Sequence, residues 1–66
     1  MMKYAIRIAD RTETRTVDRL GRTDLQFPYD NLTKARNAMR VFRGRPAFAG
    51  KALSLVRVKR NRVLEG

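Results

Sequence analysis

The chain begins with a strict alternation of apolar and polar residues. Over residues 3–9, the large apolar side chains occupy every second position, at Tyr4, Ile6 and Ile8. A period of two is typical of a strand with one buried face and one face in solvent. We therefore expect residues 3–9 to form a strand whose solvent face is basic.

A weaker strand pattern follows in residues 14–20. This segment is rich in β-branched residues, although only Val17 and Leu20 are strongly apolar. We expect it to pair antiparallel with the first strand. Gly21 indicates a bulge or bend, after which residues 24–27 continue in an extended conformation. The pattern leaves open one long, kinked strand or two short strands.

The clearest periodicity lies in residues 31–43. Apolar residues recur there at steps of three and four, which predicts an amphipathic helix; they are Leu32, Ala35, Ala38, Met39 and Phe42. Asp30 or Asn31 is suited to cap its first turn. Gly44 follows the last turn, where we expect a left-handed conformation, and Pro46 prevents the helix from continuing.

Residues 51–60 predict a final strand, and residues 44–50 form the loop that leads into it, with Phe48 against the edge of the core. The apolar positions of this strand slip by one in the middle: they are Leu53, Leu55, Val56 and Val58. Either both sheet faces are partly covered there or a bulge shifts the register. Residues 61–62 could turn, and residues 63–64 could add a short return segment.

Together these elements predict a single α+β domain over residues 1–66, in the order β-β-α-β. A three-stranded antiparallel sheet would carry the helix on the face that holds the apolar side chains of the first strand. The opposite face, with Lys3, Ala5 and Arg7, has no element left to cover it.

The composition argues against catalysis. The chain has no cysteine and no histidine, which removes disulfides, thiolate metal sites and the usual general base. Its carboxylates are scattered rather than paired, at Asp10, Glu13, Asp18, Asp24, Asp30 and Glu65. The segment from Gly44 to Lys51 resembles a phosphate-binding loop, but it has one residue too many between its glycines, and Ala52 replaces the metal-binding hydroxyl. We expect no enzyme activity, no metal and no cofactor.

No apolar run is long enough to cross a bilayer, and no signal-peptide pattern opens the chain. We therefore expect a cytoplasmic protein that does not contact membranes.

The charge indicates a polyanionic partner. Sixteen Lys and Arg residues stand against six Asp and Glu residues, which gives a net charge of +10. Such a charge repels itself in a compact chain, and a polyanion would neutralise it. The charge could also have arisen without a polyanionic partner. Twelve of the sixteen cations are Arg, which a GC-rich genome favours without selection for binding, and a basic surface also confers solubility.

Two clusters of cations are candidates for nucleic-acid contact. One is a helical stripe at steps of four and three residues, and the other lies at the end of the last strand; cations around the 44–50 loop could join them at one end of the domain. The candidate residues are Arg36, Arg40, Arg43, Arg45, Lys51, Arg57, Lys59, Arg60 and Arg62. The stripe could instead be a solvated face whose charge suits the helix dipole, and the last cluster a frayed terminus. Tyr4 and Phe42 fall on core faces, which argues against an aromatic stacking platform for bases.

Three segments resemble a known class of viral proteins. They are Tyr4-Ala-Ile-Arg-Ile8 as the opening strand, Tyr29 with Leu32-x-x-Ala35 at the helix start, and Leu55-Val-Arg-Val58 as the closing strand. This arrangement is similar to small bacteriophage β-β-α-β host-takeover proteins, such as the RNA polymerase inhibitors of T7-like phages. The resemblance implies a phage origin and a compact binding domain. It carries over no site residues, and this chain lacks acidic residues on which the inhibitors partly rely.

We expect a small basic nucleic-acid-binding protein that contacts double-stranded DNA, in preference to RNA, through Arg and Lys contacts to phosphates with low sequence specificity. The alternative is a phage-type protein-binding effector that inhibits a host complex such as RNA polymerase, docking an acidic surface of that complex on the open sheet face or an edge strand. The same edge could close a homodimer. A third possibility is a ribosome-associated basic protein.

Overall fold

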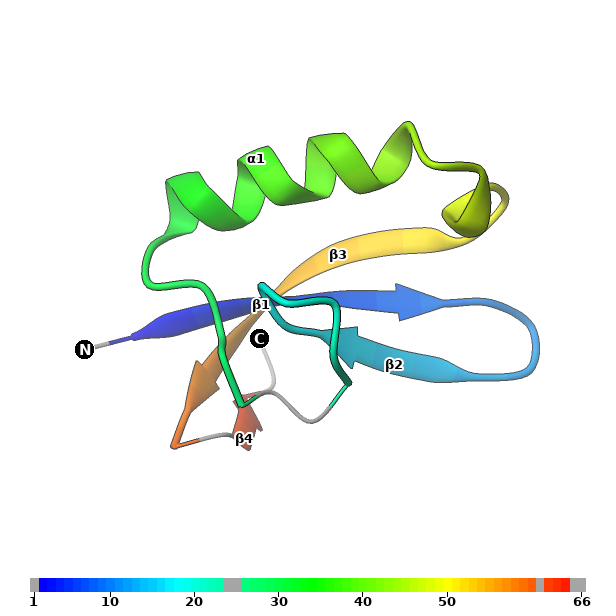
Figure 1. Ribbon diagram of the computed structural model, residues 1–66. Helices are drawn as coiled ribbons and strands as arrows, with labels where there is room; N and C mark the ends of the chain where they lie inside the picture. Colours follow the sequence, from blue (N-terminus) through cyan, green and yellow to red (C-terminus); the bar gives the residue numbers. More distant parts are fainter. Residues whose placement is uncertain (1, 24–25, 61, 65–66) are drawn as a thin grey trace.

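One helix lies across one face of a four-stranded antiparallel sheet in the computed structural model of the chain (Figure 1). Residues 2–23, 26–60 and 62–64 are described. The elements are β1 (Lys3–Ala9), β2 (Thr14–Val17), α1 (Leu32–Arg43), the 3-10 helix η1 (Pro46–Phe48), β3 (Ala52–Lys59) and β4 (Arg62–Leu64). The strands are arranged in the order β2-β1-β3-β4. The predicted α+β class is confirmed. The prediction of three strands is wrong because β4 adds a fourth, in the place where the sequence pattern allows residues 63–64 to form a short return segment.

The β1 and β3 strands pair along their lengths without a bulge. The register runs from Lys3 opposite Val58 to Ala9 opposite Ala52. The register therefore decides between the two explanations for the shifted apolar pattern of β3, namely a bulge or partial coverage of both faces. Leu55, opposite Ile6, faces the helix, and the next residue along β3 faces the other side of the sheet, so both faces of this strand are partly covered.

The main core lies between the sheet and α1, on the predicted face. Its buried residues are Ile6, Ile8, Val17, Tyr29 and Ala35. Half-buried apolar side chains from α1, η1 and β3 pack around them, including Phe48, which confirms its predicted place at the edge of the core. The small side chain of Ala35 allows the helix backbone to approach the sheet closely.

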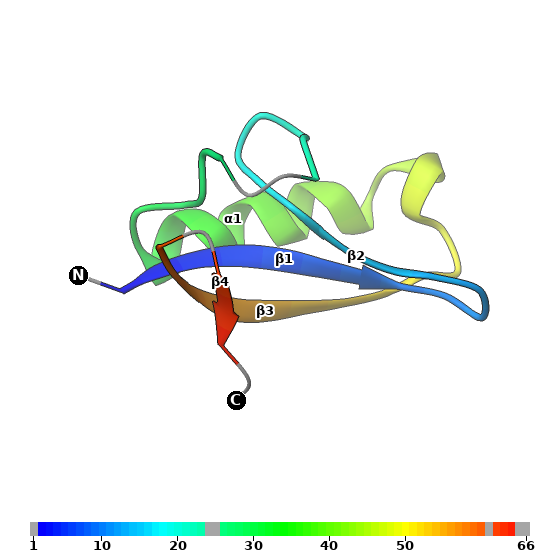
Figure 2. The ribbon, with the colours of Figure 1, turned by 90° about the horizontal axis from the view of Figure 1, so that it is seen from below.

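A second, smaller core lies on the opposite face of the sheet, which the sequence pattern left uncovered. Ala5, Val56 and Val58 are buried there, and Val63 of β4 packs against them. The prediction that no element covers this face is therefore wrong at the end of the sheet where β4 lies. The reason is the turn at Arg60, whose φ of 50° lies in the left-handed region and lets β4 return along β3. Figure 2 shows β4 on the side of the sheet away from the helix.

Local capping sets the ends of α1. The side chain of Asn31 accepts a hydrogen bond from the Lys34 amide at 2.9 Å, so Asn31 is the cap, and Asp30 instead forms an ion pair with Lys3. The prediction for Gly44 is wrong: its φ of −84° is right-handed, because the chain runs on into η1 at Pro46 instead of reversing. Neither helix in the described part of the chain has the length and apolarity needed to cross a bilayer.

The second strand ends earlier than predicted, at Val17, because the next residue turns the chain. The side chain of Asp18 is completely buried, and its carboxylate accepts hydrogen bonds from the amides of Leu20 (2.9 Å), Arg22 (2.8 Å) and Phe27 (3.2 Å). Gly21 has a φ of 79°, which confirms the predicted bend. Asp18 thus fixes a loop that folds back toward the sheet.

The return of this loop replaces the predicted continuation of the second strand. Residues 24 and 25 of the predicted 24–27 extension lie outside the described residues, and residues 26–27 form bends rather than a strand. Tyr29 then takes the place beside β1 that β2 has left. Its backbone exchanges hydrogen bonds of 2.8 and 2.9 Å with Tyr4.

Burial, and secondarily the Asp18 carboxylate, raises the pKa of Tyr29 above its ordinary value.

We predict that Asp18→Ala unfolds the domain under mild conditions. The change leaves three amides without their acceptor, at a cost of about 3 kcal/mol or more. A chain of this length has a total folding free energy of about 3–10 kcal/mol. Urea denaturation followed by circular dichroism measures the loss.

The matched control is Asp30→Ala, which removes the same charge from a side chain that is 62% exposed. Its free energy of unfolding should stay within about 1 kcal/mol of the parent. Equal stabilities of the two variants would contradict the role assigned to Asp18.

Candidate nucleic-acid interface

The net charge of the chain is carried by its second half. Residues 31–64 contain no carboxylate, whereas residues 1–30 contain six cations and five carboxylates. The carboxylate-free segment holds ten cations: Lys34, Arg36, Arg40, Arg43, Arg45, Lys51, Arg57, Lys59, Arg60 and Arg62. In the fold this segment supplies α1, η1, β3 and β4. These four elements therefore carry the excess positive charge of the fold.

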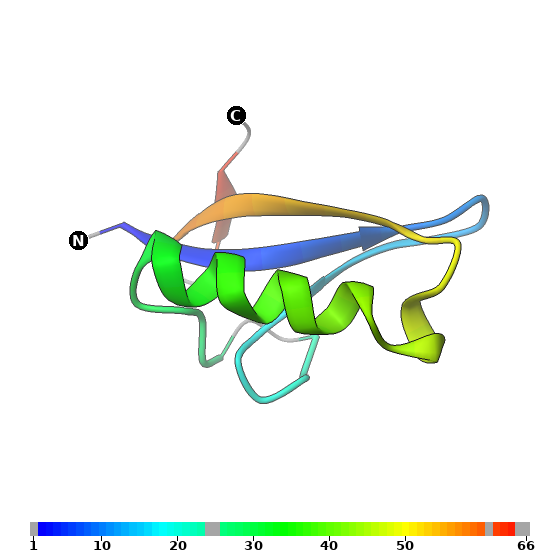
Figure 3. The ribbon, with the colours of Figure 1, turned by 90° about the horizontal axis from the view of Figure 1, so that it is seen from above.

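The helix stripe consists of Arg36, Arg40 and Arg43, all exposed. Ala38 and Val41, on the other flank of the helix, line a groove with the 18–23 loop, so at about 100° per residue the stripe lies on the flank toward β3. Figure 3 shows the helix between that loop and β3. None of the ion pairs among the described residues involves α1.

The hairpin cluster consists of Arg57, Lys59, Arg60 and Arg62, at the turn between β3 and β4. All four residues are exposed. The register places Lys59 opposite Arg62. It also places Arg57 opposite Tyr4, whose side chain packs into the core on the helix-facing side of the sheet. Arg57, Lys59 and Arg62 therefore share the helix-facing side of the sheet.

The cations do not gather at one end of the domain as predicted. Lys51 lies beside the end of β1, where it pairs with Asp10, whereas Lys59 lies beyond the start of β1. Because β3 runs back along β1, its eight residues separate the two groups by about 25 Å, at about 3.3 Å per residue. Arg43, Arg45 and Lys51 thus lie at the opposite end of the sheet from the hairpin cluster (Figure 1).

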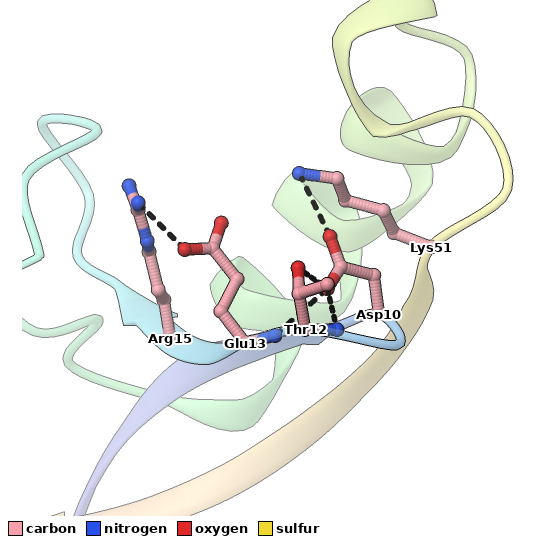
Figure 4. A network of polar contacts seen from close by, with 5 residues as sticks. All are labelled: Asp10, Thr12, Glu13, Arg15 and Lys51. Carbon is pink, nitrogen blue, oxygen red and sulfur yellow. Dashed lines mark hydrogen bonds and ion pairs between the residues drawn. The ribbon is translucent and has the colours of Figure 1, made fainter.

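Two of the cations near the β1–β2 turn are matched by carboxylates (Figure 4). Lys51 lies 3.7 Å from the Asp10 carboxylate, and Arg15 lies 2.8 Å from Glu13. Asp10 also accepts hydrogen bonds from the Thr12 and Glu13 amides at 2.7 and 2.9 Å and from the Thr12 hydroxyl at 2.9 Å. These hydrogen bonds, with a smaller contribution from Lys51, lower the pKa of Asp10 from 3.8 to about 2. Lys51 therefore carries little uncompensated charge.

Two half-buried aromatic rings are covered by arginines of the same chain. The guanidinium of Arg45 lies 5.6 Å from the centre of the Phe42 ring, and the Phe48 ring lies 5.1 Å from it. Arg19 and Arg22 lie 5.4 and 5.9 Å from the centre of the Phe27 ring. Sequence reasoning missed Arg19 and Arg22, because their contact with Phe27 exists only once Asp18 has folded the loop.

The loop from Gly44 to Lys51 uses its own amides internally. The amides of Phe48, Ala49 and Lys51 each donate to a carbonyl three residues earlier. A phosphate-binding loop needs free amides directed at the ligand. The geometry is that of a connector between α1 and β3, as the sequence indicates.

We predict that the Asp10 carboxyl titrates with a midpoint near 2, measured by the pH dependence of the Thr12 and Glu13 amide shifts. Because the folded pKa lies below the unfolded value of 3.8, the carboxylate stabilises the fold above about pH 4. This contribution is lost as the pH falls toward 2.

Asp10→Asn should remove that part of the pH dependence of stability while leaving the fold at neutral pH. A midpoint near 4 in the parent protein would show that the turn does not hold the carboxylate as described.

Comparison with protein-family models, with curated proteins and with solved structures finds no match to this chain. The resemblance to bacteriophage host-takeover proteins therefore stays a prediction, and the function has to be argued from the arrangement of charge on the fold.

Proposed function

We propose that this chain is a small nucleic-acid-binding protein that holds double-stranded DNA, in preference to RNA, through the helix stripe and the hairpin cluster. The observation that carries the proposal is the carboxylate-free segment 31–64, with its ten cations. A surface of one charge sign costs self-repulsion in the free protein. Phosphates would relieve that repulsion on binding.

The chemistry of the two clusters suits phosphates rather than base edges. Six of their seven members are Arg, whose planar guanidinium forms paired hydrogen bonds with phosphate oxygens. The helix stripe extends about 10 Å along α1, since seven residues advance by about 1.5 Å each. Such a row can follow a backbone without reading a sequence, which supports low specificity.

The aromatic rings support duplex binding over single-strand binding. Single-strand binders stack bases on free aromatic faces. Here Phe42 and Phe27 are covered by arginines, and Tyr29 is buried in the core. The longest dimension of the domain is 32 Å, which corresponds to about nine base pairs at about 3.4 Å each.

We predict that duplex affinity falls roughly a thousandfold between about 50 and 200 mM salt, because about six phosphate contacts release that many counterions. An electrophoretic shift titration on duplex DNA, single-stranded DNA and RNA measures the three affinities side by side. A flat salt response on the duplex would overturn the proposal, and tighter binding to RNA would overturn the preference for DNA.

We predict that replacing Arg36, Arg40 and Arg43 with Gln weakens duplex binding at least tenfold. The change should also reduce the slope of log affinity against log salt by about 2.7, since each phosphate contact contributes about 0.9. Replacing the four residues of the hairpin cluster with Gln should act in the same direction.

The matched control removes three cations from the first half of the chain, by changing Arg7, Arg11 and Arg22 to Gln. The salt slope of this control should stay at the parent value. Equal losses in the control and in the helix variant would mean that net charge alone, and not the two clusters, determines binding.

A further inference from the structure

A groove that the proposed DNA contacts do not use lies between the 18–23 loop and the flank of α1 away from β3. This flank groove has a volume of about 540 Å³ and is lined on opposite sides by Leu20 and Val41. Figure 3 shows the loop running beside the second half of the helix. The helix stripe lies on the other flank of α1, so the two surfaces are distinct.

The flank groove gathers exposed apolar surface. Leu20 is 56% exposed and Val41 is 55% exposed, and they are two of the three exposed large apolar residues in the described part of the chain. Single exposed apolar residues are common on proteins, whereas these two come from segments distant in sequence and line one groove. Phe42 also lines the groove.

A deeper hollow of about 290 Å³ continues the flank groove toward the β1–β2 turn. Gly21, Phe42 and Arg45 line both cavities. Ile8 and Phe48 add apolar surface to the deeper part, whose far end is lined by the ion pairs of Asp10 with Lys51 and of Glu13 with Arg15. A combined space of this size can hold a small molecule or a few side chains of a bound segment.

Two guanidinium groups flank the apolar surface. Arg19 and Arg45 both line the flank groove, and each lies over a phenylalanine ring of its own chain. Neither takes part in an ion pair within residues 2–23, 26–60 and 62–64. Held against a ring, a guanidinium loses less freedom when it binds a carboxylate.

We infer that the flank groove binds a short acidic segment of a protein partner. One apolar side chain of that segment lies between Leu20 and Val41, and carboxylates on either side of it pair with Arg19 and Arg45. An aliphatic or aromatic side chain suits the aliphatic walls. A nucleobase would need a free ring face, and Arg45 and Phe48 already cover Phe42.

The test uses the full isotope-labelled chain and amide chemical-shift mapping. The probe is the capped peptide Asp-Glu-Phe-Leu-Asp-Glu, and two reference peptides separate its components. One replaces the Phe-Leu pair with Ser-Ser, and the other replaces the four acidic residues with Lys. The acidic apolar peptide should shift the amides of Leu20, Val41 and Arg45, and each reference peptide should bind at least tenfold more weakly.

The variant Leu20→Ser with Val41→Ser should weaken binding of the acidic apolar peptide at least tenfold. Both side chains are more than half exposed, so the fold should survive the change. The matched control is Met2→Ser, which changes the third exposed large apolar residue and should leave peptide affinity unchanged. Equal binding of the Ser-Ser peptide, or shifts confined to other residues, would overturn the inference.

Two further outcomes would also overturn it. Shifts of the same amides that depend on protein concentration alone would assign the groove to a second copy of the chain. Oligothymidylate binding that is lost in the Leu20/Val41 variant would assign it to nucleic acid. The Leu20/Val41 variant should bind duplex DNA with the affinity of the parent protein. The helix-stripe variant should bind the peptide with the affinity of the parent protein. A failure of the groove proposal can therefore be told apart from a failure of the DNA-binding proposal.

Discussion

The arrangement of the loop between β2 and α1 depends on one buried carboxylate. Asp18 is fully enclosed and holds three backbone amides, the last of them nine residues further along the chain. These bonds bring Tyr29 beside Tyr4 and so direct the chain into the start of α1. They also present Leu20 and the neighbouring Arg19 along the helix. In a domain whose folding free energy is small, one buried polar group can therefore fix the path of a whole loop.

Local spacing is sufficient to predict the elements that bury a continuous stripe of their own side chains. The period of two in residues 3–9 and the helical period in residues 31–43 predict β1 and α1 to within one residue. The burial of Asp18 has no such local signal, because its acceptor role depends on the amide of Phe27 after the chain has turned back. The β4 strand has three residues, which is too short for a clear periodic pattern. Val63 becomes partly buried because β4 pairs with β3 and packs it against the second core.

The sequence is sufficient to predict each cluster of cations in the candidate interface, but not how the clusters lie relative to one another in the fold. The spacing of Arg36, Arg40 and Arg43 places them on one flank of the helix wherever the helix packs. Which end of that flank lies toward Arg57 and which toward Lys51 depends on the direction in which β3 returns along β1, which is a property of the topology. The walls of the flank groove likewise belong to segments that are distant in sequence, so no motif indicates them.

The separation of carboxylates from the 31–64 segment has a consequence for how the molecule moves before it binds anything. Unequal halves give it a permanent electric dipole moment, with the positive pole toward α1, β3 and β4. In the field of a long anionic polymer this dipole would experience a torque that favours approach with that pole foremost. At physiological salt this orienting effect would act over roughly 8 Å, before any side chain makes contact.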